Sequence, residues 1–386
     1  MYLAYVNKVY ADSTLPAVNF SLHNGYGLAL AGAQVDLYMQ VKDPLFASDT
    51  LLQNFGLTKN KNLTIHLIRA RRWLGIKTNQ WFYLHVFRAI RRTENLQAVI
   101  SRDPGALPYL ARLHDRKKIP VFYQPHNYYL DLSRRPDINP KNAQKYHLIE
   151  KTFLFKMDGI LCLQKEQAAL YRQDLSANVF CTPAGMLAYK STPSRNNTQI
   201  QLVYIGSLQH KKGIDIILQA CARVQKCKFE LVLIGGRNEA EIRNARARVD
   251  KLNLQHRVTS TGWIPYREVQ GYLRSADLGI IPLQDTFYNR YLTAPNKLFD
   301  YFSHGIPVIA SDLPSIRSFV SESDGCLFFE PGNVDDCAQK IELFVSDASY
   351  QKELRRRVTQ SAPRFLWQRQ AERMLRCIDE CRVRSR

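Results

Sequence analysis

The sequence lacks several patterns that would assign a class of protein at once. No apolar run reaches the roughly 18 to 20 residues that would span a bilayer. The N-terminus has no basic stretch followed by an apolar one, so we expect no signal peptide. Low-complexity tracts and repeats of solenoid period are absent as well. The sequence therefore predicts a globular, cytoplasmic protein.

Cysteine patterns of a metal or redox site are also missing. None of the eight cysteines belongs to a C-x-x-C pair. Cys377 and Cys381 are spaced for one helix face, but no histidine or second pair completes a zinc site. We expect reduced cysteines of an intracellular protein.

Acidic residues are scarce, and the formal net charge is +20, which indicates an anionic partner. No Asp or Glu lies between Asp49 and Glu94, and we call residues 59–92 the basic-aromatic segment. Its members are Lys59, Lys61, Arg69, Arg71, Arg72, Lys77, Arg88, Arg91 and Arg92, with Trp73, Trp81, Phe82, Tyr83 and Phe87 between them. Such a segment is typical of an anionic membrane interface. A solvated helix face with buried aromatics is the alternative, and no module for nucleic acid accompanies the charge.

Short apolar runs alternate with amphipathic stretches of helix length along the 386 residues, which is typical of parallel α/β sheets. We expect strands at 32–39, 96–102, 119–127, 157–164, 200–208, 229–236, 258–263, 276–283 and 306–310. The stretch 182–198 is rich in Pro, Ser, Thr and Asn and predicts a linker. Two βα domains joined there would form a cleft at the carboxyl ends of their strands, where ligands usually bind.

A first phosphate-binding candidate is YIGSLQHKKG, residues 204–213. A buried strand ends at Gly206, and Lys211 and Lys212 precede Gly213 and a helix. Glycine permits close backbone approach, and a helix N-terminus with ammonium groups attracts phosphate. The segment fits neither the P-loop spacing nor the dinucleotide fingerprint, and a plain basic turn is the alternative. The strand-closing IGG at 234–236 is a second such turn.

The stretch TAPNKLFDYFSHGIPVIAS, residues 293–311, predicts a helix that begins near Pro295 and a buried strand. Free amides at Asn296 and Lys297 would face the cleft, and Asp300 would lie one turn further along. Stabilisation of the helix dipole is the alternative role for these charges. In the first domain, His126 of QPHN follows a strand and would face the same cleft.

Together these motifs resemble the nucleotide-sugar glycosyltransferases of family 4, which have the two-domain GT-B fold. GSLQHKKG is similar to the Gly-Arg-Leu…Lys-Gly motif of the family, and PNKLFDYFSHGIPVIAS to its P-x-K-x-x-E-Y block. IGGR, GWIPYREV, ADLGIIPL, QPHN and EKTFLFKMDGILCLQ match further family segments. The resemblance covers residues 95–380 well and 1–94 loosely.

The resemblance implies an α/β fold of two Rossmann-like domains facing each other across a cleft. The N-terminal, acceptor-side domain would span 1–185 and the nucleotide-sugar domain 199–365. A terminal helix, 366–386, would cross back to the first domain.

The resemblance also implies a role for each matching residue. The transferred sugar would contact His126 at the reacting centre, and Lys212 would bind the diphosphate and offset leaving-group charge. Asp300 would bind the ribose diol. The remaining donor-binding residues would be Gly206, Ser207, Gly235, Trp263, Ile264, Ala294, Pro295, Asn296 and Lys297.

Two positions depart from the family pattern. The first acid of its paired-acid motif falls on Leu292, and the Arg of its phosphate clamp falls on Ser207. Arg290 or Lys211 could supply the missing charge. The first-domain Gly-Gly loop is replaced by ADSTLPA, residues 11–17.

The reaction implied is a retaining transfer from a nucleoside diphosphate sugar to a glycan, lipid-linked or envelope-polysaccharide acceptor, at the cytoplasmic face of the membrane. No metal or other cofactor is expected, and no D-x-D triplet occurs in the sequence. The alternatives are a non-catalytic GT-B protein that pairs with an active transferase or docks at membranes, a nucleotide-sugar epimerase and a soluble disaccharide synthase.

Overall fold

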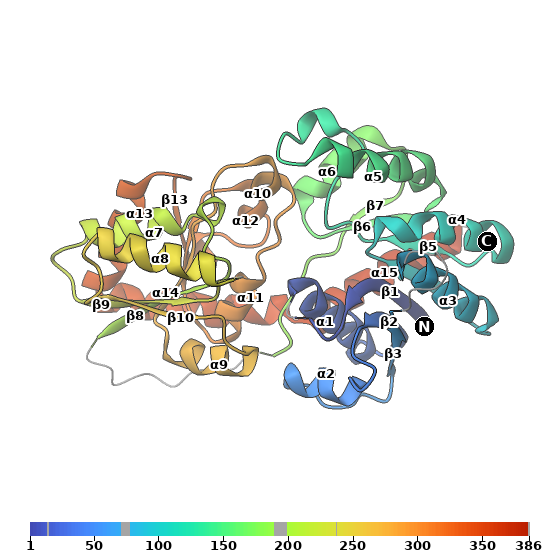
Figure 1. The fold of residues 1–386 in the computed structure, drawn as a ribbon, viewed down its shortest axis with the longest axis horizontal. Helices are drawn as coiled ribbons and strands as arrows, with labels where there is room; N and C mark the ends of the chain where they lie inside the picture. The colour runs from blue at the N-terminus through green and yellow to red at the C-terminus, as the bar shows by residue number, and fades with distance from the viewer. Residues whose placement is uncertain (14, 71–77, 189–198, 237, 385–386) are drawn as a thin grey trace. The chain divides into compact units, whose positions relative to one another are not determined.

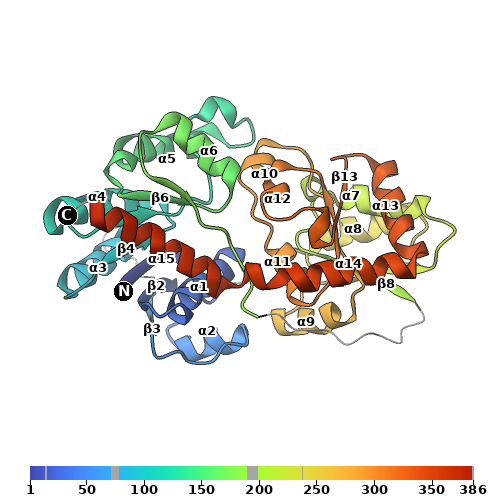
Figure 2. The same cartoon turned by 180° about the vertical axis from the view of Figure 1, so that it is seen from behind.

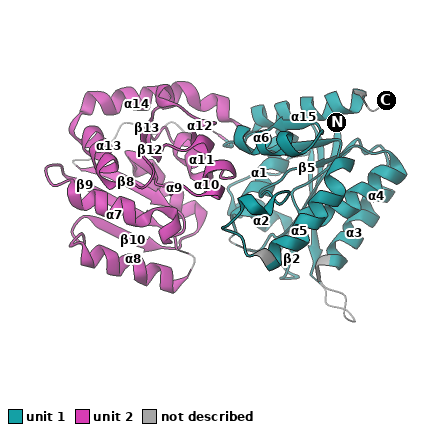
Figure 3. Cartoon of the chain, turned by 90° about the horizontal axis from the view of Figure 1, so that it is seen from above, with its two compact units in different colours: residues 1–187, 367–386 teal, residues 188–366 magenta. Residues whose placement is uncertain are grey.

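A computed structural model describes residues 1–13, 15–70, 78–188, 199–236 and 238–384. The chain divides into two units (Figure 3). Unit 1 combines Met1–Leu187 with Trp367–Arg386, and unit 2 is Ala188–Leu366. Most of the expected linker, Arg71, Arg72, Trp73 and Lys77 of the basic-aromatic segment, Thr14 of the ADSTLPA loop, and Arg237 of IGGR lie outside the described residues.

Unit 1 is built on a seven-stranded parallel sheet with the strand order β3-β2-β1-β4-β5-β6-β7. The strands are β1 (Tyr2–Tyr10), β2 (Gln34–Val41), β3 (Leu63–Arg69), β4 (Ala98–Ser101), β5 (Val121–Tyr123), β6 (Gly159–Cys162) and β7 (Val179–Cys181). The chain reverses its direction of sheet growth after β3, which is the topology of doubly wound α/β domains. Their carboxyl ends meet at one edge, which carries the loop with His126 after β5.

The helices of unit 1 are α1 (Pro16–Leu30), α2 (Ser48–Asn54), α3 (Thr78–Arg92), α4 (Leu107–Lys117), α5 (Pro140–Phe153), α6 (Lys165–Asp174) and α15 (Trp367–Arg384). The C-terminal α15 lies along α1 (Figure 2), and Trp367 packs edge-on against Phe20 with ring centroids 5.5 Å apart. Gly27 permits this approach, because a Cβ there would lie 3.0 Å from that of Trp367. Buried residues of both helices share one hydrophobic core with β1, β2 and β4.

Three of the aromatic residues of α3 belong to the interior of unit 1, while Trp81 is half-buried. Phe82, Tyr83 and Phe87 are all buried, and the ring of Phe87 stacks on Tyr109 of α4 with centroids 5.4 Å apart. These rings therefore do not reach the surface, and the exposed side chains of α3 include Leu84 and the basic residues Arg88, Arg91 and Arg92.

Unit 2 repeats the doubly wound pattern in a six-stranded parallel sheet with the order β10-β9-β8-β11-β12-β13. The strands are β8 (Ile200–Ile205), β9 (Phe229–Ile234), β10 (Val258–Gly262), β11 (Leu278–Ile281), β12 (Val308–Ser311) and β13 (Cys326–Phe329). The helices are α7 (Ile214–Arg223), α8 (Glu239–Lys251), α9 (Tyr266–Ser275), α10 (Phe287–Tyr291), α11 (Asn296–Ser303), α12 (Pro314–Arg317), α13 (Val334–Ser346) and α14 (Ala348–Ser361). Helices α7 and α8 lie side by side (Figure 1).

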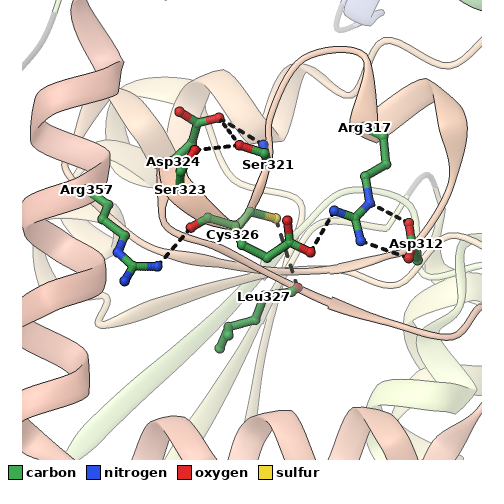
Figure 4. A network of polar contacts seen from close by, with 9 residues as sticks. Asp312, Arg317, Ser321, Ser323, Asp324, Cys326, Leu327 and Arg357 are labelled. Atoms are coloured by element: carbon green, nitrogen blue, oxygen red, sulfur yellow. Dashed lines mark hydrogen bonds and ion pairs between the residues drawn. The ribbon is translucent and has the colours of Figure 1, made fainter.

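A polar network fixes the connection between β12 and β13 (Figure 4). Arg317 donates from Nε to Asp312 and from Nη1 to Glu322, each at 2.6 Å, and its guanidinium lies over the ring of Phe328. Asp324 accepts from the amide of Ser321 at 2.8 Å and caps the short turn that leads into β13. Since β12 packs beside β11, this network supports the strands next to the candidate site.

Candidate functional site

Three neighbouring strands of unit 2 end in glycines at the carboxyl end of the sheet. We call Gly206, Gly235, Gly236 and Gly262 the glycine edge. β8 ends before Gly206, β9 ends before Gly235, and β10 ends at Gly262. The amide of Gly236 donates to the carbonyl oxygen of Gly206 at 3.2 Å. Gly235 has a φ of 128°, and a Cβ there would lie 2.2 Å from that same oxygen, so only glycine fits. The edge therefore presents bare backbone that a ligand can approach closely.

Two lysines predicted from separate motifs lie beside this glycine edge. Nζ of Lys297 lies 4.0 Å from the centroid of the Tyr204 ring and would be 3.3 Å from a Cβ on Gly206. Burial, and then the charge of Lys212, lower the pKa of Lys297 to about 7. The structure thus brings Lys212 and Lys297, which we call the lysine cluster, together beside Gly206. The cluster is suited to bind an anion, because a nearby negative charge would raise the pKa of Lys297 and keep it protonated.

Asp300 lies on α11 one turn after the helix begins, as expected. Its Oδ1 accepts a hydrogen bond from the hydroxyl of Tyr266 at 2.6 Å. Burial raises the pKa of Asp300 to about 6, while the Tyr266 hydrogen bond and the charge of Lys297 oppose this rise. The carboxylate is therefore ionised at neutral pH and can accept hydrogen bonds from a ligand.

Tyr266 also ties the loop after β10 to α11. It is the first residue of α9, and it follows Trp263 and Ile264 by three and two positions. The Trp263 side chain is 54% exposed directly after the glycine that ends β10. This exposed indole, three residues before the tyrosine that binds Asp300, offers a flat surface on which a nucleobase can stack.

Ser207, which occupies the position of the expected arginine, is part of the turn that supports the glycine edge. Its hydroxyl donates to Oε2 of Glu241 at 3.0 Å, and its carbonyl oxygen accepts from the hydroxyl of Tyr204 at 2.6 Å. Glu241 is 9% exposed and also accepts from the amide of Leu208 and the side chain of Gln209. Ser207 therefore supplies no positive charge, and its side chain fixes the turn.

Helix α11 begins one residue later than the sequence indicated. Pro295 is its N-cap residue, and the Pro295 carbonyl oxygen accepts from the amide of Leu298 at 2.9 Å. Because proline has no amide hydrogen, only Ala294, Asn296 and Lys297 of the predicted set 294–297 can donate a backbone hydrogen bond. The amides of Asn296 and Lys297 are among those that an α-helix leaves without an intrahelical acceptor.

Neither Arg290 nor Lys211, the residues proposed to supply the charges missing at Leu292 and Ser207, joins Lys212 at the glycine edge. Leu292 is 3% exposed and packs as an apolar side chain. Arg290 forms a two-pronged ion pair with Asp285 of the same loop. Lys211 is exposed, unlike the half-buried Lys212 next to it. The lysine that joins Lys212 at the glycine edge is Lys297.

His126 lies in unit 1, in the loop that follows β5 rather than within the predicted strand. The residue is exposed, yet desolvation by the surrounding protein and the charges of Arg102 and Arg135 lower its pKa to about 4. Its imidazole is therefore neutral at pH 7. Just before it, the side chain of Gln124 is buried and accepts from Tyr5 at 2.6 Å and Asn24 at 2.9 Å, which holds the start of the loop.

Several residues of these sites escaped the sequence reasoning. Tyr204, Glu241 and Tyr266 contact the predicted residues from elements distant in the chain. The ring of Tyr288 lies 5.8 Å from Nζ of Lys212. A signal existed for Tyr266, since it stands in the segment GWIPYREV that matched the family pattern.

The C-terminal unit matches a known family. Residues 199–347 match the family model described as "Glycosyl transferases group 1". TuaH of Bacillus subtilis (strain 168), named as a teichuronic acid biosynthesis glycosyltransferase, is 30% identical over 132 residues, 33% of this chain and 32% of its own length. The amylovoran biosynthesis glycosyltransferase AmsK of Erwinia amylovora is 27% identical over 32% of this chain and 30% of its own length. The alignments thus span about a third of these curated relatives.

Solved structures resemble the chain over nearly its whole length. Sucrose-phosphate synthase from Thermosynechococcus elongatus superposes with a TM-score of 0.76 at 18% identity and covers 99% of both chains. Anabaena HepE in complex with UDP gives 0.73 at 15% identity, covering 98% of this chain and 100% of its own. These likenesses confirm the predicted α/β fold of two parallel-sheet domains, and the family model confirms the resemblance to glycosyltransferases for the region that it covers.

Proposed function

We propose that this chain is a glycosyltransferase that moves a sugar from a nucleoside diphosphate sugar to a glycan, lipid-linked or envelope-polysaccharide acceptor. The family model covers the unit that carries the lysine cluster. Two relatives are named for teichuronic acid biosynthesis and amylovoran biosynthesis, and the structural neighbour HepE was solved with UDP and with UDP-glucose.

The observation that carries the proposal is the convergence of Lys212 and Lys297 on the glycine edge. In the proposed complex these ammonium groups and the amides of Ala294, Asn296 and Lys297 bind the diphosphate. Asp300 accepts from the ribose hydroxyls, and the backbone at Trp263 and Ile264 borders the base. Since negative charge grows on the departing diphosphate, the two lysines stabilise the transition state more than the ground state.

The proposed reaction retains the anomeric configuration and uses no resident metal ion. The neutral imidazole of His126 contacts the transferred sugar at the reacting centre. Front-face attack, in which the leaving phosphate takes the proton of the acceptor hydroxyl, requires no protein carboxylate as nucleophile. Transfer should therefore continue in the presence of a chelator.

The first test measures nucleotide binding to the purified protein by its melting temperature. UDP and GDP are each added at saturating concentration, and the nucleotide that binds should raise the melting temperature. A ligand at 100 times its Kd stabilises the folded protein by about 2.7 kcal/mol. Since its binding should be about 10-fold weaker or more, Lys212→Ala should lose half or more of this shift. The exposed neighbour variant Lys211→Ala should retain it as the matched control. Absence of a shift with all common nucleoside diphosphates would contradict the proposal.

Mass spectrometry of the products then separates the activities. Transfer to membrane-extract acceptors that disappears in His126→Ala supports the glycosyltransferase. Nucleotide binding without transfer identifies a non-catalytic partner protein. Conversion of the nucleotide sugar to its epimer when no acceptor is present identifies an epimerase. Transfer to a free sugar identifies a disaccharide synthase.

We also infer that the protein works at the cytoplasmic face of a membrane. No described helix is long and apolar enough to cross a bilayer. Among the described residues of the basic-aromatic segment, Phe82, Tyr83 and Phe87 are buried, so that part of the segment offers charges and few exposed apolar groups for insertion. The exposed face of α5 and the turn after it provide both, since Leu148 and Phe155 are 55% and 67% exposed among Lys141, Lys145 and Lys151, without an acidic residue.

Vesicle binding tests this surface. The wild type should sediment with vesicles rich in phosphatidylglycerol and not with phosphatidylcholine alone. Leu148→Ser/Phe155→Ser should abolish sedimentation, while Leu343→Ser, an exposed leucine on α13 of unit 2, should not. If instead only Arg88→Gln/Arg91→Gln/Arg92→Gln abolishes binding, α3 is the membrane surface and the inference for α5 is wrong.

A further inference from the structure

Glu150 is a carboxylic acid enclosed in the interior of unit 1. It lies in the last turn of α5 and is 0% exposed. Its Oε2 accepts from the amide of Tyr129 at 2.9 Å, and its Oε1 accepts from the hydroxyl of Tyr123 at 3.1 Å. The hydroxyl of Tyr171 lies 3.3 Å from Oε1. Such a group needs every hydrogen bond it can make, because burial of an unsatisfied carboxyl is costly.

All three partners of Glu150 hold the loop that carries His126. Tyr123 is the last residue of β5, three positions before His126, and the amide of Tyr129 lies three positions after it. The hydroxyl of Tyr171 donates to the carbonyl oxygen of Asn127 at 3.1 Å. One buried carboxyl therefore connects both sides of the exposed histidine.

Other side chains hold the carbonyl groups of the same loop. Gln167 donates to the carbonyl oxygens of Pro125 at 3.2 Å and Asn127 at 3.3 Å. Arg135 donates to the carbonyl oxygen of Tyr128 at 3.0 Å. The backbone on both sides of His126 is thus fixed by Gln167 of α6 and by Arg135, which precedes α5, while the imidazole itself is exposed.

The hydrogen count at Tyr171 indicates the protonation state of Glu150. A tyrosine hydroxyl has a single hydrogen, so Tyr171 cannot donate to Asn127 and to Glu150 at once. If the carboxyl is neutral, its own O–H donates to the Tyr171 oxygen, and Tyr171 is free to donate to Asn127. Its other oxygen still accepts from the amide of Tyr129, so all of these hydrogen bonds can form together.

The charges around Glu150 agree with a neutral carboxyl. Burial raises its pKa to about 8, against the hydrogen bonds from Tyr129, Tyr123 and Tyr171 and the charge of Arg135. The guanidinium of Arg135 is paired through Nε and Nη2 with Asp137, at 2.9 Å in each case, and is not a dedicated partner of Glu150. From β6, the thiol of Cys162 also faces the carboxyl and is neutral, because burial raises its pKa.

We propose that Glu150, in its neutral form, is a positioning residue that sets the place of His126 through the relay from its carboxyl to Tyr171 and Asn127 and through the amide of Tyr129. Its effect on catalysis rests on the proposed function, in which His126 contacts the transferred sugar. Its effect on the loop does not.

The test compares Glu150→Gln, Glu150→Ala and Tyr171→Phe. Through its oxygen the glutamine amide accepts from Tyr129, and through its NH₂ it donates to the oxygens of Tyr171 and Tyr123. Only the donation from Tyr123 is lost, so the relay to Asn127 remains and the variant should keep kcat and the loop. Glu150→Ala and Tyr171→Phe should lower kcat about 10- to 100-fold, since displaced catalytic groups lose rates of that order. KM for the donor should change little, because the lysine cluster belongs to unit 2. Tyr171→Phe keeps its ring and serves where Glu150→Ala does not fold.

A second readout is independent of activity. With ¹⁵N-labelled histidine, the His126 signals are identified by their absence in His126→Ala, and they should shift in Glu150→Ala and Tyr171→Phe but not in Glu150→Gln. If those signals shift while no variant, wild type included, transfers sugar, the positioning role stands and the proposed function is wrong. If the wild type transfers sugar and Tyr171→Phe changes neither kcat nor the signals, or if Glu150→Gln is as impaired as Glu150→Ala, the positioning role is wrong.

Discussion

The hydroxyl of Tyr266 donates a 2.6 Å hydrogen bond to the carboxylate of Asp300, and this contact joins two segments 34 positions apart. One segment follows the glycine end of β10, and the other is the first turn of α11. The bond orients Oδ1 and leaves Oδ2 of Asp300 for a ligand. It also opposes the effect of burial on the pKa of Asp300, which is raised to about 6.

The raised pKa of Asp300 predicts that affinity for the nucleotide decreases on the acidic side of its pH profile, which we call the acidic limb. Below about pH 6 Asp300 becomes protonated, so affinity for the bound nucleoside diphosphate should fall as the pH is lowered through 6. Tyr266→Phe removes a hydrogen bond that lowers the pKa, so the fall should begin at a higher pH. Asp300→Asn should bind weakly and show only the titration of the terminal phosphate of the nucleotide, whose pKa is also about 6. Calorimetric Kd values between pH 5 and 8 test this, and a limb that stays in place in Tyr266→Phe would contradict it.

The lysine cluster predicts a basic limb of opposite sign. Lys297, with a pKa lowered to about 7, loses its charge as the pH rises, so affinity should decline above pH 7 and binding near that pH should take up a proton. Lys212→Ala removes the neighbouring like charge and should move the limb to higher pH. It should also weaken binding by about 10-fold or more, since a charge-assisted hydrogen bond contributes roughly 1.5–3 kcal/mol. Calorimetry in two buffers of different ionisation enthalpy measures the proton uptake, and Lys297→Met shows the titration of the nucleotide alone.

Much of the fold could be predicted because buried parallel strands are written in the sequence as continuous apolar runs between amphipathic helices. FELVLI and LGII, for example, became β9 and β11 within the predicted bounds. Tyr2–Tyr10 was not predicted, although it forms the interior strand β1 of unit 1. Its apolar run is interrupted by Asn7 and Lys8, which hides a buried strand from a reading based on hydrophobicity alone.

The site was predicted only as far as local motifs reach. Gly206, Lys212 and Lys297 stand in recognisable turns and helix starts, and the structure brings them together. The partner residues Tyr266, Glu241 and Glu150 were not predicted as parts of a site, because their roles depend on contacts between elements 20 or more residues apart. For the aromatics of the basic-aromatic segment the sequence left two interpretations open, since periodicity does not tell which face of α3 packs on α4. The structure shows that Phe82, Tyr83 and Phe87 are buried.

The glycine edge predicts a large difference between two otherwise similar substitutions. Gly235→Ala places a Cβ 2.2 Å from the Gly206 oxygen at a φ of 128°, and should lower the free energy of unfolding by roughly 1–3 kcal/mol. Gly271 lies within α9 with nothing within 4 Å of an added Cβ, so Gly271→Ala should raise it by about 0.5–1 kcal/mol. Urea denaturation measures both. Equal effects would show that the edge can move apart to admit a side chain.

The buried carboxyl of Glu150 predicts how stability changes with pH. Its pKa is 4.5 ordinarily and about 8 in the folded protein, so the folded state binds a proton that the unfolded state releases above pH 4.5. The contribution of Glu150 to stability is thus fully present below pH 4.5 and is lost as the pH rises through 8, with a slope of at most about 1.4 kcal/mol per pH unit. Glu150→Gln does not titrate, so the free energy of unfolding of the wild type minus that of Glu150→Gln should fall between pH 5 and 8 and level off above. Parallel curves from urea denaturation across this range would mean that Glu150 is ionised in the folded protein, and the relay through Tyr171 could not form as described.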